Sequence, residues 1–168
     1  MMYARAVNAF SATRAGTWVV RHIAAKLDPV IFARTDGRLT LTVVPTLPML
    51  TLTVPGRRTG APRSVQLAYL LERGGGSAEH EGTAYLVVGS AMGQDHDPDW
   101  VLNLRASGRG TVRLPGHVED VAGTELTPEQ KERVWPALET AIPQLRTYRQ
   151  RTTRYIPVMR LVPDGAQA

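Results

Sequence analysis

The chain has 168 residues, a formal net charge of +5 and no cysteine. This length suits one domain with a full hydrophobic core, and the absence of cysteine excludes a disulfide framework, a thiol nucleophile and a cysteine zinc site. All of the 20 lysines and arginines except Lys26 and Lys131 are arginine. The basic charge indicates an anionic partner: a nucleotide, a nucleic acid, a phosphorylated cofactor or a lipid surface.

The N-terminal residues 3–27 are predicted to be helical, as one or two helices that end at Asp28-Pro29, because proline disfavours helix in the residue before it. The segment contains four basic residues and no acid before Asp28. Such a helix can lie on an anionic membrane; we expect it instead to pack on the domain's own core. No apolar run approaches the roughly 20 residues of a spanning helix, and no signal peptide is recognisable, so we expect a cytoplasmic protein, with membrane association as an alternative.

A turn rich in arginine is the most informative stretch of the chain. Residues 39–44 are predicted to form a strand, and residues 49–54 and 64–71 alternate with the period of two typical of half-buried strands. Between the last two strands lies the arginine turn, Pro55-Gly56-Arg57-Arg58-Thr59-Gly60-Ala61-Pro62-Arg63. Backbone N–H groups in such turns bind anions, and arginine binds phosphate and carboxylate bidentately. The turn is predicted to clamp an anionic group; a solvated cationic hairpin tip is the alternative.

The middle of the chain is predicted to contain a flexible loop at residues 73–82, an apolar strand at 83–89 and a helix that stops near Gly108. Asp97 is predicted to cap that helix, with Pro98 at its first position. The acids around His96 lack a calcium-loop spacing and a second histidine, and acids are favoured at a helix start in any case. We therefore predict no metal site here.

The last third is predicted to contain hairpin strands at 111–114 and 117–121, followed by a helix that starts at the capping box Thr127–Gln130. Trp135, Leu138, Ile142 and Leu145 form its predicted apolar face, and Pro136 and Pro143 are expected to bend or divide it. A last strand at 155–162 contains Pro157, which suggests an edge or bulge position. Short strands with helices between them indicate a small barrel in an α+β domain.

The chain has no Ser-His-Asp set, no dinucleotide-binding glycine motif and no phosphate-loop lysine. If the protein is an enzyme, a bound cofactor must carry the hard chemistry.

Four motifs in order resemble the deazaflavin-dependent nitroreductase family, split β-barrel proteins of actinobacteria that use reduced coenzyme F-420. They are Gly56-Arg57-Arg58-Thr59-Gly60-x-x-Arg63, Gly89-Ser90, Pro98-x-Trp100-x-x-Asn103-Leu104 and Tyr148-x-x-x-Thr152-x-Arg154-x-Ile156-Pro157-Val158. The resemblance spans residues 27–163, and the N-terminal helix weakly resembles that of the family's membrane-associated quinone reductases. It implies a flavin-reductase-like barrel of about six to seven mostly antiparallel strands over residues 29–163, a helical segment at 1–28 and a tail at 164–168.

The resemblance also implies the site. The arginine turn would hold the phosphate and oligoglutamate tail, the following strand would lie along the deazaflavin ring, and Trp100 would either contact the cofactor or fill the core. The implied cofactor-binding residues are Arg57, Arg58, Thr59, Gly60, Arg63, Ser64, Val65, Gln66, Leu67, Ser90, Ala91, Met92, Trp100 and Asn103.

The implied reaction is hydride transfer from reduced F-420 to a quinone, a nitroaromatic compound or an activated C=C bond. Tyr148 and Ser90 are the candidate catalytic residues, as proton donors or acceptor contacts. Close relatives often carry a lysine in the turn and a tyrosine where this chain has Leu145, which places nitroimidazole-type substrates in doubt.

Three rival interpretations stay open at this point. An FMN-dependent reductase could use the same barrel, although three arginines favour the longer anion. A non-catalytic deazaflavin carrier would need the same clamp. A nucleic-acid-binding barrel would need aromatic stacking platforms, and only Tyr69 and Tyr85 could supply them. The protein is expected to be a monomer or a homodimer.

Overall fold

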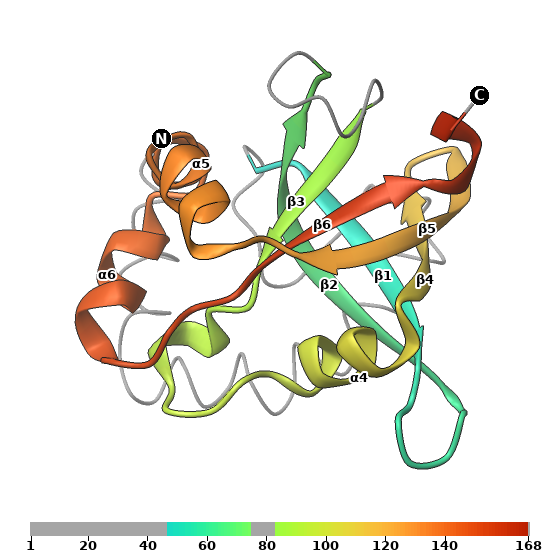
Figure 1. The fold of residues 1–168 in the computed structure, drawn as a ribbon, viewed down its shortest axis with the longest axis horizontal. Helices are drawn as coiled ribbons and strands as arrows, with labels where there is room; N and C mark the ends of the chain where they lie inside the picture. Colours follow the sequence, from blue (N-terminus) through green and yellow to red (C-terminus); the bar gives the residue numbers. More distant parts are fainter. Residues whose placement is uncertain (1–46, 75–82, 168) are drawn as a thin grey trace, which may run out of the picture.

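Six antiparallel strands form a closed barrel in the order β1-β2-β3-β6-β5-β4 in the computed structural model, which describes residues 47–74 and 83–167 (Figure 1). The strands are β1 (Met49–Pro55), β2 (Pro62–Glu72), β3 (Ala84–Val88), β4 (Arg109–Leu114), β5 (His117–Glu125) and β6 (Val158–Pro163). With the three peripheral α-helices of the described residues, this architecture is the α+β split barrel that the sequence predicts. The predicted segments at 3–27 and 39–44, and most of the loop at 73–82, lie outside the described residues.

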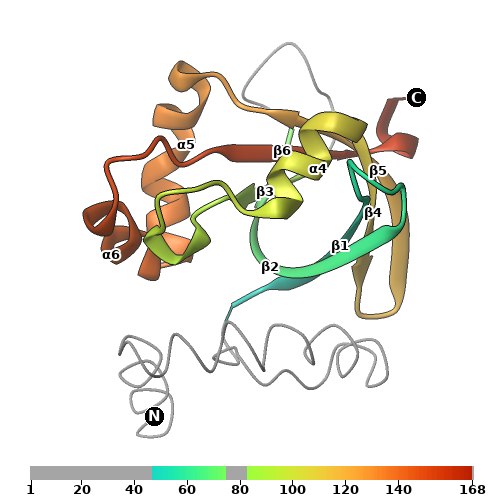
Figure 2. The same ribbon diagram turned by 90° about the horizontal axis from the view of Figure 1, so that it is seen from below.

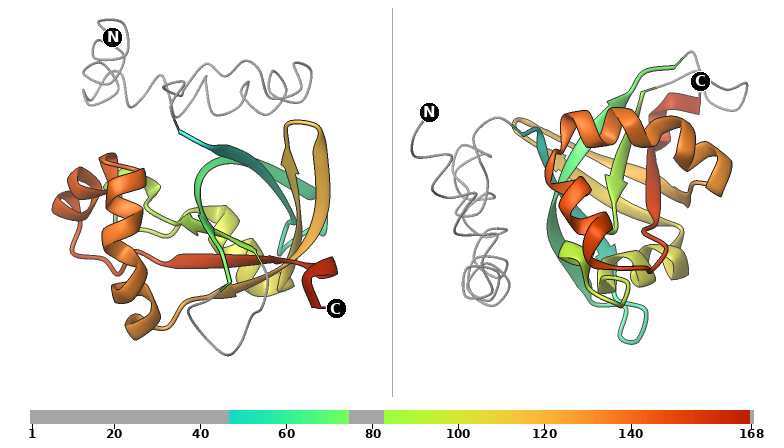
Figure 3. Two further views of the ribbon diagram at one scale, coloured as in Figure 1. Left: turned by 90° about the horizontal axis from the view of Figure 1, so that it is seen from above. Right: turned by 90° about the vertical axis from the view of Figure 1, so that its left-hand side faces the viewer.

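The helices occupy two places around the barrel. Helix α4 (Asp99–Ser107) lies across one end of the barrel (Figure 2), whereas α5 (Pro128–Ala141) and α6 (Gln144–Arg151) lie together against its side (Figure 3). Two short 3-10 helices, η2 (Ala91–Gly93) and η3 (Asp164–Gln167), precede α4 and follow β6. In the part of the chain that is described, no helix is long and apolar enough to cross a membrane.

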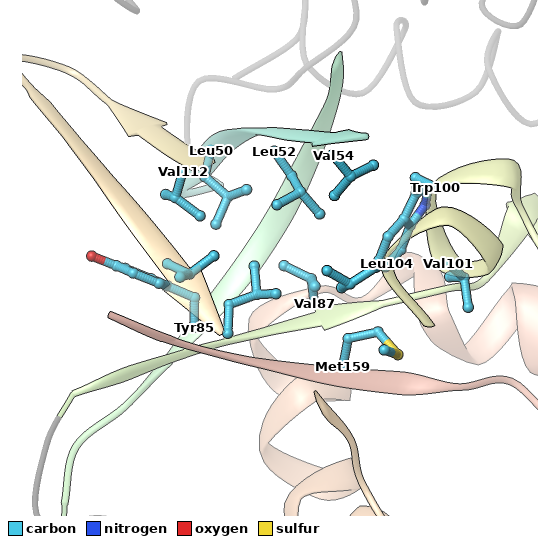
Figure 4. Packing of buried hydrophobic residues seen from close by; sticks show 12 residues of the cluster. Leu50, Leu52, Val54, Tyr85, Val87, Trp100, Val101, Leu104, Val112 and Met159 are labelled. Atoms are coloured by element: carbon cyan, nitrogen blue, oxygen red, sulfur yellow. The ribbon is translucent and has the colours of Figure 1, made fainter. Parts of the chain in front are cut away.

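The alternation of β1 separates the inside of the barrel from its outside. Leu50, Leu52 and Val54 point inward and are fully buried, together with Val112 of the neighbouring strand β4 (Figure 4). Val121 of β5 and Leu161 of β6 are fully buried in the same cluster. Burial of each such side chain contributes roughly 1.5–3 kcal/mol relative to exposure. Tyr69 and Tyr85 meet edge to face, with ring centroids 5.3 Å apart, at this same cluster. The two tyrosines are therefore packing residues of the barrel.

A second apolar cluster joins the barrel to α5 and α6. The predicted helical face is confirmed: Trp135, Leu138, Ile142 and Leu145 are all buried, beside Leu86 and Val158 of the barrel. The predicted capping box is also confirmed, since the Thr127 hydroxyl accepts from the Gln130 N–H and the Gln130 side chain accepts from the Thr127 N–H. Pro136 lies within α5, whereas Pro143 separates α5 from α6.

Two local predictions are wrong. Asp97 does not cap α4; Pro98 occupies that position without a side-chain hydrogen bond. The Asp97 carboxylate instead accepts hydrogen bonds from Arg105 and Arg154, and two charge-assisted bonds stabilise it more than one cap bond would. Pro157 is at neither an edge nor a bulge, because β6 pairs with β3 on one side and β5 on the other and begins only at Val158. Because Pro157 precedes the strand, its lack of a backbone N–H removes no hydrogen bond from the sheet.

Candidate functional site

The arginine turn is closed by its own backbone. Pro55 pairs with Pro62 at the end of the β1–β2 ladder, and Gly56 donates to the Ala61 carbonyl over 2.9 Å. Gly60 donates to the Gly56 carbonyl over 2.7 Å and has φ +69°, a left-handed conformation that glycine adopts without steric cost. These bonds fix the hairpin tip, so the arginine side chains start from a defined backbone.

Arg57 ties this turn to helix α4. Its backbone N–H and its Nη1 both donate to Oδ1 of Asn103, over 3.1 and 3.0 Å, and Nη1 also meets Oδ1 of Asp99 at 2.9 Å. Asn103 is only 5% exposed, whereas the Asp99 carboxylate is largely exposed. A buried amide oxygen that accepts two bonds from one residue fixes the helix against the turn. Asn103 and Arg57 therefore shape this site together.

A pocket of about 640 Å³ opens between the turn and the start of α4, within the range typical of small-molecule and cofactor sites. Neither the Arg58 nor the Arg63 guanidinium has a hydrogen bond or ion pair to any described residue, and both side chains are exposed. With the single carboxylate of Asp99 already paired, the pocket has an excess of positive charge. It is lined by Gly56, Arg57, Arg58, Thr59, Arg63, Ser64, Val65, Asp99, Trp100 and Asn103.

The predicted strand residues alternate between the two faces of β2, so Val65 and Leu67 share the face that packs on the interior cluster. Ser64 and Val65 line the pocket, and the Ser64 hydroxyl lies 2.9 Å from that of Thr53. Leu67 packs on the interior cluster of the barrel, and neither Leu67 nor Gln66 lines the pocket. Their contact with a cofactor stays a prediction.

Trp100 fills the core, as one of the two predicted roles requires. It lies on α4, is 8% exposed and belongs to the interior cluster (Figure 4). It also lines the pocket, and its contact with a cofactor stays a prediction. A tryptophan in this position supplies a rigid apolar wall beside the arginines.

The predicted loop at Ser90–Met92 connects β3 to α4 and has an unusual backbone. Ala91 and Met92 have φ values of 45° and 55°, a region that residues with a side chain seldom adopt. The N–H groups of Gly93 and Gln94 donate to the carbonyls of Ser90 and Ala91 over 2.8 and 3.1 Å. None of the three predicted residues lines the pocket, so their role also stays a prediction.

Helix α6 supports this loop from outside. A Cβ on Gly93 would lie 2.7 Å from Cβ of Arg151 and 2.9 Å from the Tyr148 carbonyl oxygen, so the two backbones meet without room for a side chain. The structure thus brings the backbone of Tyr148 next to the loop that begins at Ser90, while the Tyr148 ring packs on the second apolar cluster. Burial raises the pKa of the Tyr148 hydroxyl, with Arg151 opposing the shift. The group stays protonated near neutral pH, as a hydrogen-bond donor.

The acidic residues around the start of α4 pair with arginines. Asp97 meets Arg105 and Arg154, and Asp99 meets Arg57. Within the described ranges, no three residues of the metal-binding types are grouped to hold an ion. A hollow of about 670 Å³ lies beside these residues and shares Arg57 and Asp99 with the pocket.

Sequence reasoning missed two residues. The sequence places Asp99 in an acidic cluster at a helix start, weighed there as a metal site or as helix-start acids, and the structure shows it paired with Arg57. Arg154 belongs to a motif without a predicted role, and it binds the loop between β3 and α4 over separations of up to 65 residues. No local pattern could have revealed these pairs, because the sequence shows where an arginine stands but not which distant residue it contacts.

Coenzyme F-420 carries a phosphate and an acidic tail, and the residues present fit such a ligand. Two arginines that have no partner among the described residues stand beside a third that is anchored, around a pocket of suitable volume. A clamp of this kind suits an anion with several charged groups.

Comparison with known proteins gives a consistent result. An F420H(2)-dependent quinone reductase of Mycobacterium tuberculosis is 28% identical over 148 residues, which cover 84% of this chain and 93% of that protein. A solved F420-H2 dependent reductase is 29% identical with a TM-score of 0.57, covering 68% of this chain and 93% of the other. A protein solved as a domain-swapped dimer is 26% identical with a TM-score of 0.59, covering 88% and 98%.

Residues 25–163 match the family described as F420H(2)-dependent quinone reductase. The match takes in the whole barrel, the arginine turn and the segment that contains Tyr148 and Arg154. The chain therefore belongs to the F420H(2)-dependent quinone reductase family.

Proposed function

We propose that this protein is an oxidoreductase that passes a hydride from reduced coenzyme F-420 to a quinone. The observation that carries the proposal is the arginine-lined pocket, in a chain of a family described by that reaction. Reduced deazaflavin supplies a hydride, that is, two electrons and a proton together. The family description names F-420, so the FMN alternative is not needed.

The residues of this chain would bind and orient the reactants. Arg58 and Arg63 are the proposed contacts for phosphate and tail carboxylates, and Arg57, held by Asn103, would fix the direction from which the cofactor enters. Trp100 and Val65 would exclude water from one wall. Holding a donor and an acceptor in near-attack geometry contributes several kcal/mol to catalysis.

A proton must follow the hydride to the reduced acceptor. The Ser90 and Tyr148 hydroxyls are the proposed donors or acceptor contacts, and neither makes a hydrogen bond within the described residues. Because burial raises the Tyr148 pKa, Tyr148 is better suited to orient the acceptor by a hydrogen bond than to give up its proton. Nitroaromatics and activated C=C bonds are electron-poor in the same way, and we propose them as secondary acceptors.

The first test is a fluorescence titration of the protein with oxidised F-420 and, separately, with FMN. Charge-assisted hydrogen bonds contribute roughly 1.5–3 kcal/mol each, so Arg58→Ala and Arg63→Ala should each raise the Kd for F-420 about tenfold or more. Arg113→Ala is the matched control, because Arg113 is an exposed arginine on β4 that does not line the pocket. Binding should weaken with salt.

Different results would separate the alternatives. F-420 binding that both clamp variants leave intact would remove the arginine turn from the site. Preference for FMN would contradict the cofactor. F-420 binding without quinone reduction would favour a carrier protein.

Assembly and location extend the proposal. A similar protein was solved as a domain-swapped dimer, and we propose a homodimer here, to be checked by light scattering. Peripheral membrane contact through residues 1–28 is proposed from their basic charge. Co-sedimentation with anionic vesicles, lost when residues 1–28 are removed, would support it.

A further inference from the structure

The guanidinium of Arg154 makes an unusually large number of hydrogen bonds, mostly to backbone carbonyls. Its side chain is 14% exposed. Nε donates to the Gln94 carbonyl over 3.1 Å, and Nη2 donates to the carbonyls of Gly89 and Ser90 over 3.0 and 3.2 Å. Nη1 meets the Asp97 carboxylate and the carbonyl of Tyr155. One guanidinium thus binds both ends of the segment that joins β3 to α4.

The segment that Arg154 binds is the one with the unfavourable backbone. Ser90 and Gln94 flank Ala91 and Met92, which both have positive φ. Such conformations persist only where the surroundings over-determine them, and they cluster at ligand contacts. Three carbonyls bound by one planar cation provide that constraint, because their oxygens must converge on the fork of donors.

Arg154 is itself held from two directions. Asp97 also accepts from Arg105 over 2.5 Å, and Arg105 in turn donates to Glu125 at the end of β5. On the other side, the ring of Tyr155 lies 3.9 Å from Nζ of Lys131 on α5. Asp97 and the Tyr155 carbonyl therefore hold the guanidinium opposite the three loop carbonyls.

We propose that Arg154 is a positioning residue, which holds Ser90-Ala91-Met92 in the shape that contacts the cofactor and so determines F-420 affinity. The inference rests on the proposed function, since the loop's contact with F-420 is part of it. Arg154 acts through the loop and lies outside the lining of the arginine pocket.

Arg105 offers a matched control. It shares the Asp97 carboxylate with Arg154 but has no bond to a loop carbonyl. The test therefore compares Arg154→Gln and Arg154→Lys with Arg105→Gln. A lysine keeps the charge but cannot span three carbonyls, because its ammonium is a point donor.

The first readout needs no cofactor. Amide hydrogen exchange of the free protein reports on the N–H groups of Gly93 and Gln94, whose acceptors are loop carbonyls. We expect at least about tenfold faster exchange at both amides in the two Arg154 variants, because local opening governs their protection. The Gly108 and Ile142 amides, at the ends of α4 and α5, should keep their protection.

The second readout is the fluorescence titration with F-420. Arg154→Gln should raise the Kd by about tenfold or more, Arg154→Lys nearly as much, and Arg105→Gln less than about threefold. A Kd restored by lysine would overturn the inference, because charge alone would then suffice. If Arg154→Gln does not fold, Arg154→Lys decides on both readouts.

The outcomes distinguish this inference from the proposed function. Unchanged exchange at Gly93 and Gln94 in the Arg154 variants overturns the positioning role. Faster exchange with an unchanged Kd overturns the link to the cofactor. A wild-type protein that does not bind F-420 overturns the proposed function, and with it the cofactor half of the inference, while the exchange data still decide whether Arg154 holds the loop.

Discussion

The buried amide of Asn103 gives the sharpest prediction about how the turn and α4 are joined. Its Oδ1 accepts from the Arg57 backbone N–H over 3.1 Å and from Arg57 Nη1 over 3.0 Å. Asn103→Ala removes both bonds. A part-buried backbone N–H then loses its acceptor, whereas the partly exposed guanidinium keeps Asp99 and reaches water.

The cost follows from these two losses. An unsatisfied buried donor costs roughly 1–3 kcal/mol, and a compensated hydrogen bond contributes about 0.5–1.5 kcal/mol. Together they lower the free energy of unfolding by about 1.5–4.5 kcal/mol. For a chain of this size each kcal/mol shifts Tm by roughly 2–4 °C, so the expected loss in Tm is about 3–18 °C.

The assay is thermal unfolding followed by circular dichroism, together with the F-420 titration. Because Arg57 loses its anchor, the Kd for F-420 should rise about tenfold. Asn103→Asp is the matched control, since a carboxylate of the same shape still accepts both bonds. It should retain most of the Tm but weaken F-420 binding, because it adds a negative charge beside the arginines.

Two results would refute this reasoning. An Asn103→Ala protein that melts within about 2 °C of the wild type would show that the two bonds contribute little to stability. An Asn103→Ala protein with a lower Tm and an unchanged Kd would show that the anchoring of Arg57 does not matter for the cofactor.

Three further predictions concern the helices beside the barrel. Gly93→Ala should destabilise the protein by about 1–3 kcal/mol in urea unfolding, since its Cβ would meet the Arg151 Cβ at 2.7 Å; unchanged stability would mean that α6 yields easily. Tyr148→Phe should leave Tm nearly unchanged and, if the hydroxyl contacts the acceptor, lower kcat/KM about tenfold or more. Because the pKa of Tyr148 is raised, its deprotonation should cause no loss of wild-type rate at pH 7–9. An unchanged kcat/KM in the variant would remove Tyr148 from the site. Burial lowers the pKa of Lys131, so between the folded and unfolded values the unfolded chain binds more protons and wild-type stability rises with pH. Urea unfolding should therefore show that Lys131→Met gains most free energy of unfolding over the wild type near pH 7 and loses this advantage towards pH 10.5. Tyr155 is present in both proteins, so its titration does not contribute to the difference. A difference that does not depend on pH would contradict the argument.

Local patterns in the sequence determined the hairpin, the capping box and the cationic turn. The two flanking strands alternate with period two, and proline and glycine between them allow only a turn. Thr127 and Gln130 are three residues apart, so their reciprocal cap forms wherever the helix begins. Each of these features depends on residues close together in the chain, and the order of the four motifs indicated the family.

Only the tertiary structure decided which distant groups meet. The barrel order places β6 between β3 and β5, a pairing that alternation cannot encode because each of these strands could pair with several others. Asp97 has the spacing of a helix cap, yet the fold brings Arg105 and Arg154 to it, and two cationic partners outweigh one backbone donor. The same closure converts Arg57 and Asn103, 46 residues apart, into one wall of the pocket. A sequence shows that an arginine needs an anion or a carbonyl, and the packing of the barrel determines which one it finds.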